Sequence, residues 1–267
     1  MDRQAAVAGQ FYPGRQKELK AEVVAFLRQR RAPEQAIGMM VPHAGYIYSG
    51  AIAGETFSQV KIPDRVVLLG PNHTGHGASR AVYPSGVWHT PLGEAPIDGD
   101  LAARIIDDCP GSLADELAHR YEHSLEVQVP FIQVAAPQAR LVPVCLAPAP
   151  LRELLEFGTC LGRLLATDSP PALLIASSDM THFESAEAAR EKDQKALDRI
   201  LALDPEGLYR CVSADRISMC GVVPTVVMLA AARELGAQRA RLVRYGHSGE
   251  RSSDYGEVVG YAGVIVD

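Results

Sequence analysis

Short apolar runs that end in polar, histidine-bearing loops occur three times in this chain. They are 37–41 before His43, 66–69 before His73, and 172–176 before Asp179 and His182. Apolar runs of this length that stop at Gly, Pro or Ser are typical of strands buried on both faces of a parallel sheet. Ligands bind at the carboxyl edge of such sheets, so the pattern predicts that these side chains share one edge.

Segments with helical spacing of apolar residues alternate with the strand-like runs. They are 15–31, 151–165, 184–203 and 217–235, and a further strand is expected at 140–146. This alternation predicts an α/β fold with a largely parallel central sheet flanked by helices. No linker, repeat or low-complexity segment interrupts the chain, so we expect a single domain over residues 1–267. A hairpin is expected at 87–93, and Pro130 should kink a helix or mark its first turn.

Composition and charge exclude several classes of partner. Apolar residues make up 47% of the chain, charged residues make up 22%, and the net charge is −6. The one basic cluster, at 28–31, is expected to end a helix, where cations complement the helix dipole. With a negative net charge and no other basic cluster, nucleic acid and anionic membranes are not expected partners. The N-terminus lacks the apolar segment of a signal peptide, and the longest nearly apolar run, 221–232, is too short to span a bilayer. We therefore expect a cytoplasmic protein.

The five cysteines are odd in number and widely spaced, without a CxxC motif. This spacing argues against a disulfide framework or a structural zinc cluster. Four of them are interpreted as small buried hydrophobic residues: Cys109, Cys145, Cys160 and Cys211. Cys220 precedes Gly221 at an expected helix start, where the helix dipole favours a thiolate that binds metal or reacts. Core packing is an equally good interpretation of Cys220 from its spacing alone.

The histidine loops could carry metal chemistry. Neutral imidazole is the commonest metal ligand, and two imidazoles with one anionic group leave positions open for substrate. The alternative for each histidine is a polar loop residue bonded to its neighbours. Glu122 and His123 form a second acid–imidazole pair that could transfer protons, or a helix-terminal carboxylate beside a loop. Asp254 could line a pocket or shape a turn.

Several motifs in order along the chain resemble the Memo family, known in prokaryotes as AmmeMemoRadiSam system protein B. They are VPHAGYIYSG at 41–50, LGPNH at 69–73, EHSLE at 122–126, SSDMTH at 177–182 and MCG at 219–221. The resemblance implies a fold similar to the class III extradiol-type non-haem iron dioxygenases. It also implies a redox metal site formed by His43, His73 and Cys220. The expected ion is iron(II), and copper and zinc are the alternatives. The dioxygenase acid/base corresponds to His182, with Asp179 beside it.

The function implied by this resemblance is that of a metal-dependent oxidoreductase or oxygen-using enzyme with a two-histidine, one-cysteine site. The ring-cleaving relatives have a carboxylate where this chain has Cys220, and a thiolate donates more charge to iron and is itself oxidisable. The alternatives are a non-catalytic protein that binds a peptide or metabolite, and a zinc-dependent hydrolase. The expected substrate is a small molecule or peptide. Family association adds a radical-SAM protein and an AMMECR-type protein as partners.

Overall fold

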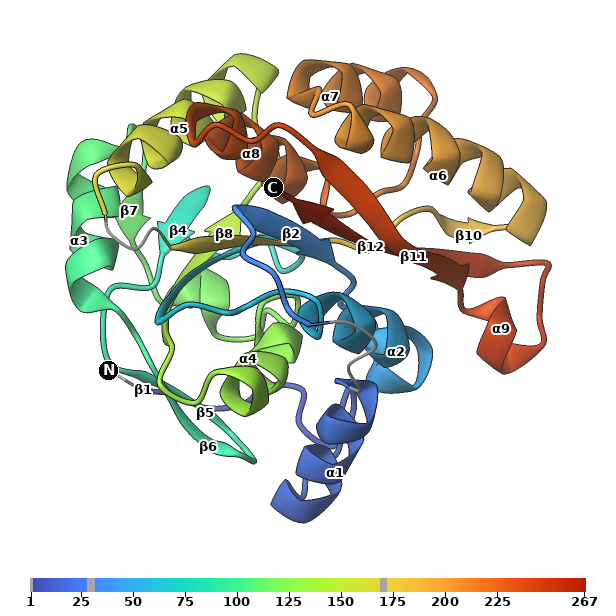
Figure 1. The fold of residues 1–267 in the computed structure, drawn as a ribbon, viewed down its shortest axis with the longest axis horizontal. Coiled ribbons are helices and arrows are strands. Elements are labelled where there is room, and N and C mark those ends of the chain that lie inside the picture. Colours follow the sequence, from blue (N-terminus) through green and yellow to red (C-terminus); the bar gives the residue numbers. More distant parts are fainter. Residues whose placement is uncertain (1, 28–31, 169–171) are drawn as a thin grey trace.

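A mixed β-sheet runs through the centre of the protein (Figure 1). The structure is a computed structural model that describes residues 2–27, 32–168 and 172–267. The central strands are β2 (Gly38–Val41), β9 (Leu173–Ser177), β3 (Arg65–Pro71) and β8 (Arg140–Leu146), adjacent in that order. All three pairings between them are parallel, so these strands end at the same edge of the sheet.

The margins of the sheet are mostly antiparallel. On one side β12 (Val258–Val266) pairs antiparallel with β2, and both β10 (His182–Glu184) and β11 (Ala240–His247) pair antiparallel with β12. On the other side β4 (Arg80–Val82) is antiparallel to β8, and β7 (Leu113–Ala114) is parallel to β4. The predicted α/β fold with a central sheet flanked by helices is confirmed, with parallel pairing concentrated at its centre.

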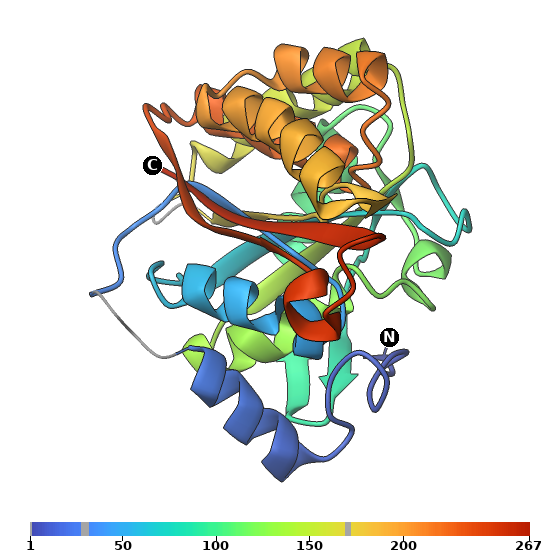
Figure 2. The ribbon, with the colours of Figure 1, turned by 90° about the vertical axis from the view of Figure 1, so that its right-hand side faces the viewer.

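Helices cover both faces of the sheet (Figure 2). One layer contains α3 (Gly99–Asp108), α5 (Leu151–Leu165), α6 (Ala186–Leu201), α7 (Pro205–Ala214) and α8 (Val222–Glu234). The other contains α1 (Gln16–Phe26), α2 (Tyr46–Phe57) and α4 (Val129–Ala135). Residues of β3 alternate between the layers, because Val67 and Leu69 pack with the first and Val66 and Leu68 with the second. This period-two burial on both faces explains why residues 66–69 of the strand are all apolar.

Smaller elements complete the fold. A separate sheet joins β1 (Asp2–Arg3) to the hairpin of β5 (Val87–Thr90) and β6 (Gly93–Pro96), which confirms the predicted hairpin. Short helices occur at η1 (Leu117–His119), η2 (Glu126–Gln128) and α9 (Gly249–Ser252). Pro130 lies in the first turn of α4, as one of its two predicted placements required. The basic cluster 28–31 lies outside the described residues, within which no helix is long and apolar enough to cross a membrane.

The cysteine prediction was wrong for one pair. Cys109, the residue that ends α3, forms a disulfide with Cys160 of α5, and their Cα atoms are 5.6 Å apart. Helices α3 and α5 pack against each other, so two cysteines separated by 51 positions meet at the helix contact. Cys145 is free and buried as expected, and Cys211 is free and partly buried. Sequence spacing alone does not reveal a contact that depends on helix packing.

Candidate metal centre

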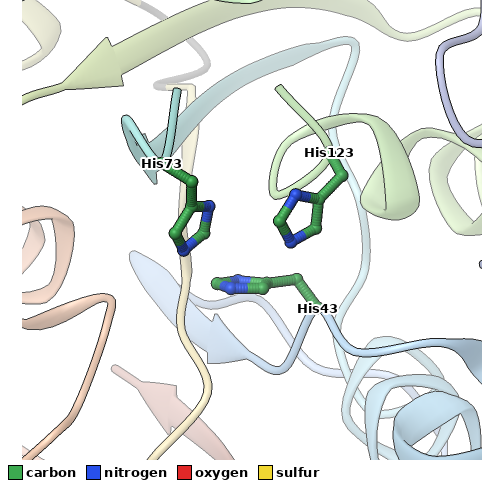
Figure 3. A group of neighbouring side chains, drawn as sticks. All are labelled: His43, His73 and His123. Carbon is green, nitrogen blue, oxygen red and sulfur yellow. The ribbon is translucent and has the colours of Figure 1, made fainter. Parts of the chain in front are cut away.

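Three imidazoles converge beside the carboxyl ends of the central strands. His43 follows β2, His73 follows β3, and His123 lies in the loop before η2. Each offers a ring nitrogen within 4.8 Å of the others'. Figure 3 shows the rings of His73 and His123 side by side, each with one nitrogen directed towards His43. His43 is buried, His123 is half-buried and His73 is exposed. The group is therefore closed on the His43 side and open to solvent on the His73 side.

Glu122 holds the His73 imidazole in place. Its carboxylate accepts hydrogen bonds from the His73 backbone N–H at 2.6 Å and the Ser124 backbone N–H at 2.9 Å, and its Oε1 lies 2.9 Å from His73 Nδ1. Burial raises the pKa of Glu122, but the His73 side chain, the Ser124 amide and His123 outweigh it and lower the pKa to about 2. An ionised carboxylate only accepts hydrogen bonds, so His73 Nδ1 donates to it, and in the neutral ring Nε2 carries the lone pair. Metal-binding histidines commonly have such a carboxylate partner.

His43 is held in the neutral form that binds metal. Its Nδ1 lies 3.0 Å from the Ser177 hydroxyl, and its backbone N–H donates to Asp179 Oδ1 at 2.7 Å. Burial lowers the pKa of His43 well below its usual value, and the neighbouring imidazoles of His123 and His73 lower it further. A neutral imidazole keeps one lone pair for a metal ion.

Cys220 lies beside the same ring of His43. Its Sγ is 3.2 Å from His43 Nε2, although the two residues are far apart in sequence. Burial and the nearby Asp179 raise the pKa of the Cys220 thiol well above its usual value. Cys220 precedes the N-cap Gly221, so the helix start that was expected to favour a thiolate is opposed here by desolvation. The thiol has two acceptors within reach, the Asp179 carbonyl oxygen at 3.7 Å and, where it is unprotonated, His43 Nε2 at 3.2 Å. A bound cation would take the place of the thiol proton.

His182 approaches the centre from β10. Its Nδ1 lies 2.8 Å from the Met180 carbonyl and 3.0 Å from the Ser218 carbonyl, and its backbone N–H donates to Ser218 Oγ. Carbonyls only accept, so Nδ1 donates to them, and in the neutral ring Nε2 carries the lone pair. The carboxylate of Asp179, expected to orient His182, instead accepts the His43 backbone N–H. Burial raises the pKa of Asp179 to about 6, against the opposing effect of the His43 and Ala44 amides and His182.

His123 and Asp254 are two further residues that the sequence analysis singled out. His123, interpreted as an acid–imidazole partner of Glu122, joins the imidazole group; its Nδ1 is 3.5 Å from Glu122 Oε1, and its ring packs on Phe11 at 4.7 Å between centroids. No apolar run ends just before His123, so the strand-end pattern did not reveal its place in the group. Asp254 is exposed, and its Oδ1 accepts the Gly256 N–H in a turn, as the simpler of its two interpretations required.

Comparisons with known proteins agree with the sequence motifs. A family model described as Memo-like protein matches residues 3–265. MEMO1 family proteins of Methanosarcina barkeri and Aquifex aeolicus are both 42% identical to this chain. The alignment covers 99% of this chain and 100% of the first relative, and 98% of each for the second. A crystal structure of an uncharacterized Escherichia coli K12 protein shares the fold, with a TM-score of 0.54, 15% identity, and coverage of 86% of this chain and 100% of that one. The chain belongs to the Memo-like protein family.

Proposed function

We propose that this protein is a metal-dependent oxidoreductase whose metal ion is bound by His43, His73 and Cys220. The observation that carries the proposal is the convergence of free donors: Nε2 of His43, Nε2 of His73, and a sulfur 3.2 Å from the former. Two ligands of one ion, bound at roughly 2.1 Å through nitrogen and 2.3 Å through sulfur, lie on the order of 3–4 Å apart. The 3.2 Å separation of Cys220 Sγ and His43 Nε2 is in this range, which supports Cys220 as a ligand beside His43. The three imidazoles are the group whose ligand atoms all lie within 4.8 Å of one another, and Cys220 is outside that group, so His123 is the competing third ligand.

Hydrogen bonding favours Cys220 over His123 as the third ligand. Metal-binding histidines almost always donate their second ring N–H to a fixed partner. His43 and His73 have such partners in Ser177 and Glu122, at 3.0 and 2.9 Å. The corresponding nitrogen of His123 is 3.5 Å from an Oε1 that His73 and an amide already occupy, so its ring is less firmly oriented. In this proposal His123 borders the open coordination positions.

A thiolate and two imidazoles suit iron, copper and zinc alike. We propose iron(II) first, as the family resemblance implies, with copper or zinc as alternatives. When bound, such an ion supplies a Lewis acid and, for iron or copper, a one-electron redox couple. The free Nε2 of His182 is the candidate general acid/base, because its Nδ1 proton is fixed on the Met180 and Ser218 carbonyls. Dioxygenase-like chemistry on a small molecule or peptide is the reaction class that we propose.

Metal analysis after anaerobic purification tests the function. We expect about one iron or copper per chain; zinc alone would favour a hydrolase, and a metal-free protein that binds peptide would favour a non-catalytic role. The ligand set is tested by four single variants, His43→Ala, His73→Ala, Cys220→Ser and His123→Ala. The first three should lose metal and the fourth should retain it. His76→Ala, an exposed histidine on the same loop as His73, is the matched control. Retention of metal by Cys220→Ser with loss in His123→Ala would replace the ligand set with three histidines.

The cellular setting is also a proposal. We propose a cytoplasmic protein that works with a radical-SAM protein and an AMMECR-type protein, as family association implies. Disulfides are rare in the cytosol of mesophiles, so the Cys109–Cys160 bond makes the location testable. Thiol trapping in intact cells followed by mass spectrometry should find this pair reduced if the protein is in a reducing cytosol, and a fully formed bond would argue against that location. Co-purification from those cells should recover the two partners.

A further inference from the structure

The Ser177 hydroxyl, at the end of β9, contacts His43, the loop before η2 and η2 itself. It is 2.6 Å from the Ser124 carbonyl oxygen, 2.9 Å from Gln128 Nε2 and 3.0 Å from His43 Nδ1. Ser177, Ser124 and Gln128 are fully buried, and His43 is 2% exposed. Water therefore does not compete for these hydrogen bonds, and their directions follow from the chemistry of the groups themselves.

The direction of each bond is determined by the groups that can only accept or only donate. The Ser124 carbonyl only accepts, so the Ser177 hydroxyl must use its single proton there. The Gln128 amide nitrogen also contacts the Pro42 carbonyl at 3.0 Å, another acceptor, which fixes the amide with its N–H groups towards Pro42 and Ser177. Ser177 therefore accepts from Gln128, and the lone pair that remains can only accept from His43.

We propose that Ser177 is a positioning residue that fixes His43 as the Nδ1–H tautomer and so keeps its Nε2 lone pair for the metal ion. With the oxygen of Ser177 saturated by one donated and two accepted hydrogen bonds, the opposite tautomer would place two lone pairs face to face. The contact of Cys220 is compatible with this assignment, since an unprotonated Nε2 can accept the thiol proton at 3.2 Å. The role of Ser177 in metal binding rests on the proposed metal site, whereas the tautomer of His43 is a property of the metal-free protein.

Gln128 also fixes the backbone next to His43. It holds the carbonyl of Pro42, the residue immediately before His43, with the same nitrogen that orients Ser177. Asp179 holds the His43 N–H from the other side at 2.7 Å. The ring, the amide and the preceding carbonyl of His43 are thus all fixed by buried groups from β9, η2 and the loops beside them.

Nitrogen NMR of ¹⁵N-histidine-labelled, metal-free protein at neutral pH tests the assignment. The His43 signals are identified by their loss in His43→Gln. We expect Nδ1 protonated and Nε2 unprotonated in the wild type, and a mixture of both tautomers in Ser177→Ala. Loss of such a supporting hydrogen bond typically lowers metal affinity by about 10- to 100-fold, and we expect that loss for Ser177→Ala in metal titrations with iron(II) or zinc.

Two variants separate this role from a structural one. Ser178→Ala removes a neighbouring, equally buried hydroxyl that donates to the Asp179 carbonyl, and should leave the tautomer and the affinity unchanged. Ser177→Thr restores the hydroxyl and should restore the single tautomer. An Nε2-protonated His43 in the wild type, or an unchanged tautomer in Ser177→Ala, would overturn the inference even if other variants fail to fold. A wild type with the expected tautomer that binds no metal would support the inference while refuting the proposed function.

Discussion

Replacing Glu122 by Gln should destabilise the protein by removing the charge that holds the His73 loop. The ionised carboxylate accepts three N–H groups, and its side chain is 1% exposed. Its pKa falls from an ordinary value of 4.5 to about 2 in the folded protein. At 1.36 kcal/mol per pKa unit, that difference corresponds to about 3 kcal/mol in favour of the charged form. A neutral glutamine of the same shape should lose about this much stability at pH 7.

The same charge predicts a specific pH dependence. A carboxyl group with a depressed folded-state pKa stabilises the protein fully above its unfolded-state pKa, and this contribution disappears as the pH falls through the folded-state value. The Glu122 contribution should therefore be constant above about pH 5 and decline between about pH 4.5 and pH 2. In Glu122→Gln this part of the acid sensitivity should be absent.

Urea unfolding of chelator-treated protein at pH 7, 5, 4 and 3 measures both effects. The difference in unfolding free energy between wild type and Glu122→Gln should be about 3 kcal/mol at pH 7 and should shrink as the pH approaches 3. Glu257→Gln, at an exposed position, is the control and should change stability by less than about 0.5 kcal/mol. A pH 7 difference below about 1 kcal/mol, or a difference that is constant with pH, would refute the electrostatic reasoning.

Three other predictions follow from the same structure. Cys160→Ala opens a loop of 51 positions and should lower the unfolding free energy under oxidising conditions by about 4 kcal/mol, with Cys211→Ala as a control; equal stability of Cys160→Ala and wild type would contradict it. His182→Ala should keep its metal, measured by mass spectrometry, and lose activity, whereas metal loss would make His182 a ligand. Alkylation of Cys220 in the metal-free protein should be slow at pH 7 and rise with pH, because burial raises its pKa, and should stay blocked at all pH values when metal is bound. Equal alkylation with and without metal at high pH would exclude sulfur ligation.

The sequence determined the strands and the placement of two of the histidines. Wholly apolar runs with β-branched residues mark strands buried on both faces, and this burial is local enough to be visible in the residues themselves. His43 and His73 follow such strands directly, so their position at one edge of the sheet could be inferred from the order of the chain.

Only the tertiary structure decided which groups meet around those histidines. Cys220 reaches His43 because α8 packs against the central strands, and the Cys109–Cys160 bond exists because α3 packs on α5. Motif resemblance suggested the first contact, and no pattern in the chain suggested the second. Burial and the nearby Asp179 raise the pKa of the Cys220 thiol, against the effect expected from the helix start. Contacts of this kind depend on helix packing and on desolvation by distant segments, which are properties of the folded protein and are absent from any local stretch of sequence.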